Sequence, residues 1–291
     1  MAMERIDTGV RRIVAPNPSP MTGRGTNTYV LGSGRVAVID PGPEDAGHLA
    51  AIAEGLDPGE RIVAILVTHA HLDHSEGAPA LSRQTGAPIW AFGDADAGRS
   101  AAMSAFQGRL PEGEGTDRAF RPDRLLADGE ELGMGDWRVR ALHTPGHFGN
   151  HLSFGFGDLV FSGDVVMGWS TTLIAPPEGD LNDYFRSLAR LRGTGARRLL
   201  PGHGAPVEAP TLRIDELDAH RRLRSAQILG ALAGGPKDIP TLRAMLYPDL
   251  AAPLHPAAER NILAHLIALH AAGEVLGAAG TNGPFALPSG A

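Results

Sequence analysis

The sequence predicts an α/β domain followed by a smaller, mainly helical domain. In the first half of the 291-residue chain, short apolar runs alternate with glycine, proline and aspartate, and the whole chain contains 38 glycines and 23 prolines. Histidine and aspartate follow several of these runs. After Pro210 the apolar residues recur at helical spacing instead. We therefore expect two domains, residues 1–210 and residues 211–291.

Strands and helices alternate in the first expected domain. The glycines around Ser33 separate two short apolar runs, which indicates a β-hairpin. Residues 62–67 form a continuous apolar run rich in β-branched side chains, as in a buried strand. The expected strands are residues 28–31, 35–39, 62–67, 88–91, 137–142, 151–156, 159–162 and 198–200. The expected helices are residues 46–56, 77–85, 96–107 and 183–191.

The second expected domain has the order of a winged-helix module. Helices are predicted over residues 211–233, 241–246 and 256–272, and the last of these ends before Gly273. Asn282-Gly283 then indicates the turn of a hairpin within residues 274–287. Because positive and negative side chains nearly balance in this segment, we expect a structural or dimerising role and not DNA binding.

Composition excludes several classes of protein and of metal site. The net charge of −7 argues against a broadly basic nucleic-acid surface. The chain has no cysteine, so disulfides are impossible and a metal must be bound by histidine and carboxylate. Residues 1–14 contain no signal-peptide core, and no run approaches the roughly 18 apolar residues of a membrane span. We expect a cytoplasmic protein without a membrane partner.

Four ligand-type side chains follow the buried run 62–67. They are His69, His71, Asp73 and His74, which lie within six consecutive positions. Residues two apart in an extended segment point the same way, so His69 and His71 can converge on one metal. Asp73 and His74 come where the chain should turn into a helix, and they can face a second metal beside the first.

Three further ligand-type residues occupy equivalent places. His147, Asp164 and His203 each follow an expected strand, and each lies next to a glycine. Glycine allows the sharp turns and close backbone approach that such a loop needs. One such loop is an ordinary turn, but three in order after the first motif indicate a metal centre.

The order of these motifs resembles the metallo-β-lactamase superfamily. Asp40 after the first hairpin, the His-x-His-x-Asp-His segment, His147, Asp164 and His203 all match its pattern. The resemblance implies an αββα sandwich with metals at one edge of its two sheets. It also implies that Asp40 orients a ligand through a hydrogen bond. By this resemblance His69, His71 and His147 hold one metal, Asp73, His74 and His203 hold the second, and Asp164 bridges them.

The chain is similar in particular to the β-lactamase-like protein 2 branch of that superfamily. Residues 17–22, residues 25–29 and Thr171-Thr172 carry this similarity, together with the winged-helix tail. Members of the branch include an endoribonuclease that acts on single-stranded RNA. Residues 94–123 match nothing in the branch, so the substrate groove is not predicted.

The types of the candidate ligand atoms indicate which metal is bound and what reaction it supports. Nitrogen and oxygen ligands without thiolate favour two zinc ions over manganese or iron. We expect a metal-bound hydroxide, available near neutral pH, to attack a phosphorus or carbonyl centre. Asp73 is expected to ligate and orient it, and His151 to donate a hydrogen bond or a proton to the substrate. The other candidates for substrate contact are Asn150, Thr171 and Thr172.

Three functions remain open from the sequence. The first is hydrolysis of an anionic substrate, single-stranded RNA, for which a groove lined by arginines of residues 99–124 would supply phosphate contacts. The second is hydrolysis of a small thioester or lactone, as in glyoxalase-II-like enzymes, in a narrower apolar pocket. The third is a non-enzymatic binding protein on a relict fold, against which the intact ligand positions argue. The natural substrate, the metal used in the cell, the oligomeric state and the role of the C-terminal domain stay open.

Overall fold

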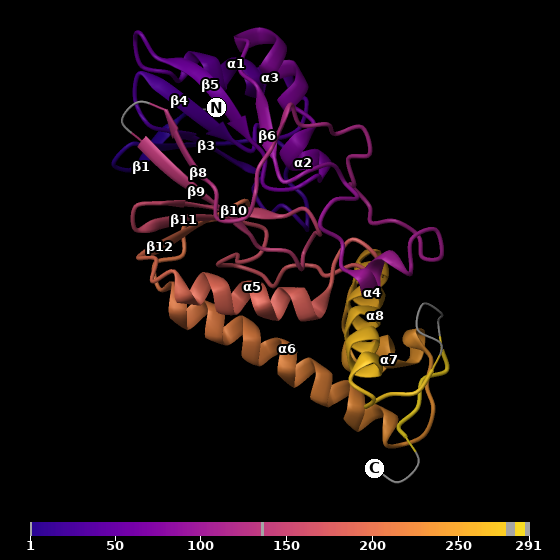
Figure 1. The fold of residues 1–291 in the computed structure, drawn as a ribbon. Helices are drawn as coiled ribbons and strands as arrows, with labels where there is room; N and C mark the ends of the chain where they lie inside the picture. The colour runs from indigo at the N-terminus through magenta and orange to yellow at the C-terminus, as the bar shows by residue number, and fades with distance from the viewer. Residues whose placement is uncertain (1, 135–136, 278–282, 289–291) are drawn as a thin grey trace.

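The computed structural model describes residues 2–134, 137–277 and 283–288, and it has the αββα layers expected from the sequence (Figure 1). The first sheet contains β1 (Glu4–Asp7), β2 (Val10–Val14), β3 (Asn27–Leu31), β4 (Arg35–Ile39), β5 (Arg61–Leu66), β6 (Ile89–Ala91) and β7 (Arg124–Leu125), in that order. The second contains β8 (Glu131–Met134), β9 (Trp137–His143), β10 (Leu152–Phe156), β11 (Leu159–Gly163) and β12 (Arg198–Pro201), and its order is β12-β11-β10-β9-β8.

Strand direction brings the loops that bear ligand-type residues to one edge. β3 and β4 form the predicted antiparallel hairpin, whereas β4, β5 and β6 run parallel. In the second sheet β9 and β11 are both antiparallel to β10, and β11 is parallel to β12. β9, β11 and β12 therefore end on the same side, and the loops after them can converge.

Three apolar cores hold the layers of the first domain together. Between the sheets, side chains such as Leu66 of β5 pack with Phe154 and Phe161 of the second sheet. Helices α1 (Ala46–Glu54) and α3 (Ala78–Thr85) cover the outer face of the first sheet, and α5 (Leu181–Gly193) covers that of the second. β5 is apolar on both faces because it lies between a helix layer and the other sheet.

The strands β1, β2, β7 and β8 were not predicted from the sequence, and one helix was predicted too long. β2 was not recognised as a strand because Arg11 interrupts its apolar pattern. Arg11 is buried and lies 2.7 Å from the Glu60 carboxylate. The expected helix 96–107 is reduced to α4 (Ala101–Ser104). Gly98 adopts φ +69° just before it, which is incompatible with a continuing right-handed helix.

The C-terminal segment packs around a core that also includes Met103 and Phe106 of the first domain. It contains α6 (Pro210–Leu232), α7 (Ile239–Leu246), the 3₁₀ turn η1 (Ala252–Leu254) and α8 (His255–Ala271). α6 begins alongside α5 and extends away from the sandwich to the helical module (Figure 1). Leu276 pairs antiparallel with Ala286, as in a hairpin, although the predicted turn residue Asn282 lies outside the described residues. The expected division at residue 210 coincides with the start of α6 and stays a prediction.

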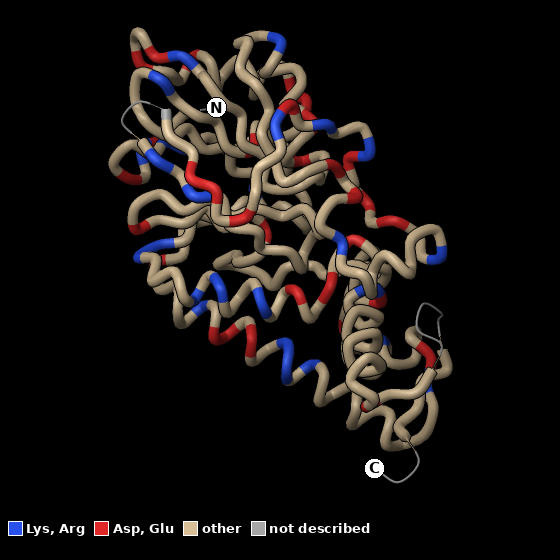
Figure 2. Tube along the Cα trace, viewed as in Figure 1, with Lys and Arg blue, Asp and Glu red and all other residues tan. Residues whose placement is uncertain are grey.

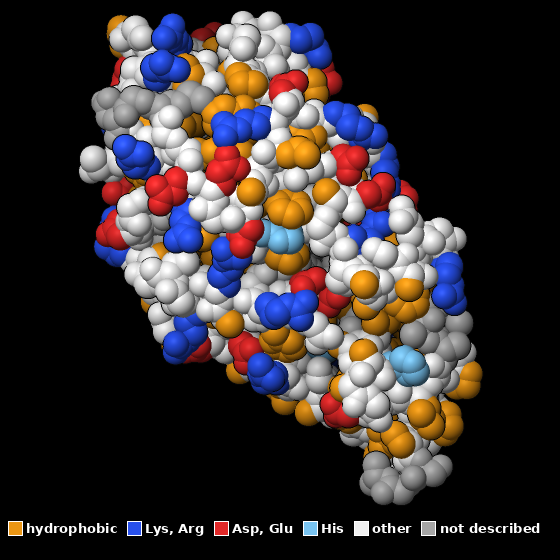
Figure 3. Space-filling model, viewed as in Figure 1, with side chains coloured by type: hydrophobic (Ala, Val, Ile, Leu, Met, Phe, Trp, Pro, Cys, Tyr) orange, Lys and Arg blue, Asp and Glu red, His pale blue; other side chains and the backbone are white. Residues whose placement is uncertain are grey.

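The surface carries charges of both signs, and the helices are not apolar throughout. Acidic and basic residues are scattered along the trace, and both signs are interspersed over the visible face (Figures 2 and 3). None of the helices in the described part of the chain combines the length and apolar character needed to cross a membrane.

Candidate metal centre

The seven side chains predicted to bind metal lie together at the edge where β5, β9, β11 and β12 end. Their potential donor atoms form three overlapping groups, and within each group these atoms lie within 4.8 Å of one another. The groups are His69, His71 and His147; His69, His74 and Asp164; and Asp73, His74 and His203.

The first expected ligand set is compact. His71 Nδ1 lies 2.9 Å from His69 Nε2 and 3.1 Å from His147 Nε2. Three imidazole nitrogens this close point at a shared space. Each lone pair needs a proton or a cation there, so the set suits a divalent ion.

The second expected ligand set adjoins the first. His203 Nε2 lies 3.3 Å from His74 Nε2 and 3.2 Å from Asp73 Oδ2. Asp164 stands between the sets, with its Oδ2 at 3.3 Å from His203 Nε2 and 3.8 Å from His147 Nε2. Asp164 Oδ1 is buried without a hydrogen-bond partner. A buried carboxylate oxygen without a donor is costly, and a cation at this place would satisfy it.

The charges divide the histidines into two kinds. Burial disfavours the charged form of His71, and the neighbouring His147 adds to this, so its pKa falls to about 3. Burial acts on His203 in the same direction, but Asp164 outweighs it and raises the pKa of His203 to about 10. Burial raises the pKa of Asp164, yet the charges of His203 and His74 bring it well below its usual range. The acidic half of the site therefore attracts positive charge, which protons or metal ions can supply.

Asp40 lies where the resemblance places it, behind the metal-facing side chains. Its Oδ2 accepts a hydrogen bond from His74 Nδ1 at 2.9 Å, which leaves His74 Nε2 free to face the other donors. It also accepts from Thr68, through the main-chain N–H and the hydroxyl, both at 2.8 Å. Asp40 adopts φ +50°, a conformation that only a few residue types, including aspartate and asparagine, tolerate.

Main-chain carbonyls fix two more rings in the same way. His147 Nδ1 donates to the carbonyl of Leu173 at 2.7 Å, and His203 Nδ1 donates to that of Gly25 at 3.3 Å. Both rings thereby present Nε2 to the cluster, which is the tautomer that metal ligation requires.

His151 does not contact the substrate space, so its expected role as a donor to the substrate is wrong. The ring is fully buried, and both of its nitrogens are engaged. Nδ1 lies 3.0 Å from Thr144 Oγ1, and Nε2 accepts the main-chain N–H of Asp164 at 3.1 Å. A Cβ on Gly163 would collide with His151 Nε2, so a glycine is needed beside it. His151 orients the peptide that carries Asp164.

Two of the other expected substrate contacts are also structural. Asn150 is buried; its amide nitrogen donates to the carbonyls of Gly93 and Asp94, and its oxygen accepts from the N–H of Ala70 at 3.2 Å. Thr172 is buried as well, and its hydroxyl lies 3.0 Å from His147 Nδ1. Both are therefore unavailable to a substrate. Thr171 is half-buried and stays a candidate.

Sequence reasoning assigned no role to Thr26 or to Thr116. Thr26 Oγ1 donates to Asp73 Oδ2 at 3.1 Å. Thr116 pairs with His71, so the segment that matched no family pattern borders the metal centre. Thr26 could have been found, because it belongs to the Gly-Thr-Asn-Thr-Tyr stretch that carried the resemblance.

Three of the five arginines expected to line a groove, Arg99, Arg118 and Arg124, are paired with carboxylates, whereas Arg121 contacts main-chain carbonyls and Arg109 lies over the ring of Phe106. Arg118 pairs with Asp96 at 2.7 Å and also with Glu112, and Arg99 pairs with Asp96 at 3.1 Å. Arg124 pairs with Glu130 at 2.6 Å. These guanidinium groups are committed to carboxylates, so they offer little free charge to a phosphate backbone.

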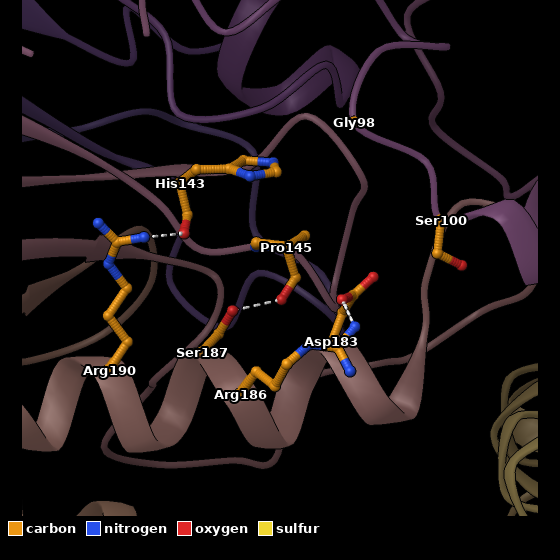
Figure 4. A pocket seen from close by; sticks show the side chains of 8 residues that line it. All are labelled: Gly98, Ser100, His143, Pro145, Asp183, Arg186, Ser187 and Arg190. Carbon is orange, nitrogen blue, oxygen red and sulfur yellow. Dashed lines mark hydrogen bonds and ion pairs between the residues drawn. The ribbon is translucent and has the colours of Figure 1, made fainter. Parts of the chain in front are cut away.

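A cavity of about 410 Å³ lies behind the loop that leads to His147, and it contains none of the seven donors. Figure 4 shows how α5 supports this loop from the cavity side. Ser187 Oγ donates to the carbonyl of Pro145 at 2.6 Å, and Arg190 donates to that of His143 at 3.2 Å. The cavity therefore lies between α5 and the loop that leads to His147, and it is separate from the metal centre.

The chain belongs to the metallo-beta-lactamase superfamily, whose family model matches residues 21–203. The model of the beta-lactamase associated winged helix domain matches residues 239–280. The fold class and family predicted from the sequence are thus both confirmed.

Several relatives match most of the chain. A beta-lactamase-like protein 2 homolog from Drosophila melanogaster is 33% identical, over 94% of this chain and 92% of its own. An atrochrysone carboxyl ACP thioesterase from Aspergillus fumigatus is 31% identical over 77% of this chain and 64% of its own. Among solved structures, a metallo-beta-lactamase family protein from Thermus thermophilus is 27% identical, with a TM-score of 0.77, and the match covers 98% of this chain and 100% of that one.

Proposed function

We propose that this protein is a two-metal hydrolase with zinc as its natural ion. The observation that carries the proposal is the convergence of seven histidine and aspartate side chains from four strand ends on one small volume. Two ions held there would lower the pKa of a water molecule to about 7 and polarise the oxygen of a substrate. The histidine-rich donor set favours zinc over manganese, because manganese prefers carboxylate, carbonyl and water ligands.

Asp73 is the side chain best placed to handle the attacking water. About 28% of its side chain is exposed, whereas those of His74 and His203 are at most 2% exposed. The hydroxyl of Thr26 holds Asp73 Oδ2. Asp73 therefore reaches the opening of the site in a fixed orientation, from which it accepts a hydrogen bond from water and takes its proton.

The rim of the site favours a neutral acyl substrate. Trp169 is 46% exposed, and its indole packs against Gly204, the residue after His203. Met21 and Leu72 are also exposed, and Leu72 lies between His71 and Asp73 in the chain. Since Arg99, Arg118 and Arg124 are paired with carboxylates, apolar contact is the main attraction that this rim offers. We propose an acyl thioester, in keeping with the thioesterases among the relatives.

Single-stranded RNA is the second candidate. It is favoured by the resemblance of residues 17–22 and 25–29 to the β-lactamase-like protein 2 branch and by the exposed Trp169, on which a base can stack. The paired arginines argue against it, because phosphate contacts dominate the affinity for RNA.

One assay separates these functions. Zinc-loaded protein is given acyl-N-acetylcysteamine thioesters, lactones and a quenched-fluorophore RNA, with Asp73→Asn as the site variant and Asp123→Asn as the control. Asp123 accepts the N–H of Ile89 and touches none of the seven donors. We expect thioester hydrolysis that Asp73→Asn loses and Asp123→Asn retains. RNA cleavage with the same dependence would select the second candidate, and failure on all substrates by a zinc-loaded protein would favour the relict binding protein.

A further inference from the structure

The loop that joins the two halves of the metal centre is held by the helix that leads into the C-terminal module. We call residues 165–173 the strap, because they connect Asp164 to the partners of His147. The strap contributes the carbonyl of Leu173 and the hydroxyl of Thr172, which both contact His147 Nδ1. The orientation of His147 therefore depends on where the end of the strap lies.

Two arginines of α6 donate hydrogen bonds to the strap, one at its middle and one near its end. Arg213 donates to the carbonyls of Met167 and Ser170, at 2.8 and 2.7 Å. Arg221 is fully buried and donates to the carbonyl of Thr172. Its guanidinium also lies over the ring of Tyr184, whose hydroxyl donates to Val165 at the start of the strap.

Arg221 connects the strap to the C-terminal module as well. Its Nη1 donates to Asn261 Oδ1 of α8 at 2.7 Å. Both hydrogen-bond partners of Arg221 are neutral, and its Nε is buried without one. A buried guanidinium is costly unless it is hydrogen-bonded, so moving the strap away would leave the charge without an essential acceptor. The side chain thus resists displacement of Thr172.

We propose that Arg221 is a positioning residue through which the C-terminal module sets the metal affinity of the site that contains His147. The chain of contacts runs from Asn261 to Arg221, to the carbonyl of Thr172, and then to Nδ1 of His147. This inference rests on the proposed metal centre. By this inference the winged-helix module acts on the metal centre through the orientation of His147, and this role needs no contact with a substrate or a second subunit.

The set of Asp73, His74 and His203 is held by different contacts. His74 is oriented by Asp40, His203 by the carbonyl of Gly25, and Asp73 by Thr26. None of these three hydrogen bonds involves the strap or α6. Trp169 of the strap does pack against Gly204 beside His203, but the carbonyls around Trp169 are held by Arg213 and not by Arg221. Loss of Arg221 should therefore weaken one ion and leave the other in place.

The test is zinc titration of metal-free protein against a chromophoric chelator, with Arg221→Met and Asn261→Ala. Arg224→Met is the matched control, because Arg224 lies one turn further along α6 and contacts the carbonyl of Leu246 and the ring of Tyr247. We expect two ions per chain in the wild type. Arg221→Met should weaken one of them about tenfold, as is usual when the support of a ligand is lost, and leave the other unchanged. Asn261→Ala should act in the same direction, and Arg221→Lys should restore part of the loss.

Thermal unfolding separates positioning from general stability. Arg221→Met and Arg224→Met should both lower the melting temperature of the metal-free protein, but the zinc-induced rise should shrink in Arg221→Met alone. Folded Arg221→Met with both wild-type affinities would overturn the inference and leave the proposed function intact. If Arg221→Met does not fold, an unchanged Asn261→Ala would overturn it. A wild type that binds fewer than two ions would overturn both.

Discussion

Replacing Asp40 by asparagine should weaken zinc binding without disturbing the backbone. Asparagine tolerates φ +50° about as well as aspartate does, so the turn after β4 is preserved. The asparagine oxygen can still accept the N–H of Thr68. Its NH₂ group cannot accept the hydrogen bonds that Oδ2 takes from the Thr68 hydroxyl and from His74 Nδ1.

Zinc binding should weaken because the substitution changes the preferred tautomer of His74. With a donor opposite Nδ1, the ring is favoured with its proton on Nε2, the atom that faces His203 and Asp73. Loss of such a partner costs roughly 10–100-fold in metal affinity. This corresponds to about 1.4–2.8 kcal/mol.

The assay is competition for zinc between metal-free protein and a chelator of known affinity. Asp180→Asn is the control, because Asp180 is also buried and accepts three hydrogen bonds, from Ser100, Asn182 and Asp183. It touches none of the seven metal-facing side chains. Wild-type zinc affinity in folded Asp40→Asn would refute the claim that Asp40 sets the tautomer of His74.

Three further outcomes follow from the same contacts. His151→Gln should lower zinc affinity but leave the pKa values of the pH–rate profile unchanged, because the ring is buried against Asp164. A shift of either pKa in the profile would instead show that His151 transfers a proton. Trp169→Ala should raise KM for acyl substrates about tenfold with little change in kcat, and an unchanged KM would remove the indole from the binding surface. Burial lowers the pKa of His265 to about 3, below its unfolded value, so its contribution to stability is full above about pH 6.5 and is lost as the pH falls toward 3. In urea unfolding of metal-free protein, His265→Gln should reduce the pH slope by up to about 1.4 kcal/mol per pH unit, and an unchanged slope would contradict this.

Elements whose local pattern agrees with their environment could be predicted from the sequence. β5 is buried on both faces and is a continuous apolar run, and the ligand-type residues after it follow at once. β2 could not be predicted, because its Arg11 belongs to a buried ion pair with Glu60 and breaks the apolar pattern. Nothing local distinguishes a buried arginine from an exposed one.

The role of several side chains depends on contacts that span the chain. His151 follows a metal-ligand motif at a spacing that suggested substrate contact, yet Gly163 leaves the room that turns it toward Asp164. Arg221 lies in a segment of α6 rich in charged residues, which is typical of a solvated helix face. It is buried because α5, α8 and the strap meet around it, and that arrangement is set by tertiary packing.

Crystallographic anomalous scattering at the zinc absorption edge would show whether this edge of the sandwich holds two metal ions. We expect two peaks in zinc-loaded protein, one among His69, His71 and His147 and one among Asp73, His74 and His203, with Asp164 between them. A single peak, or zinc bound elsewhere while these side chains stay hydrogen-bonded to one another, would contradict the two-metal centre.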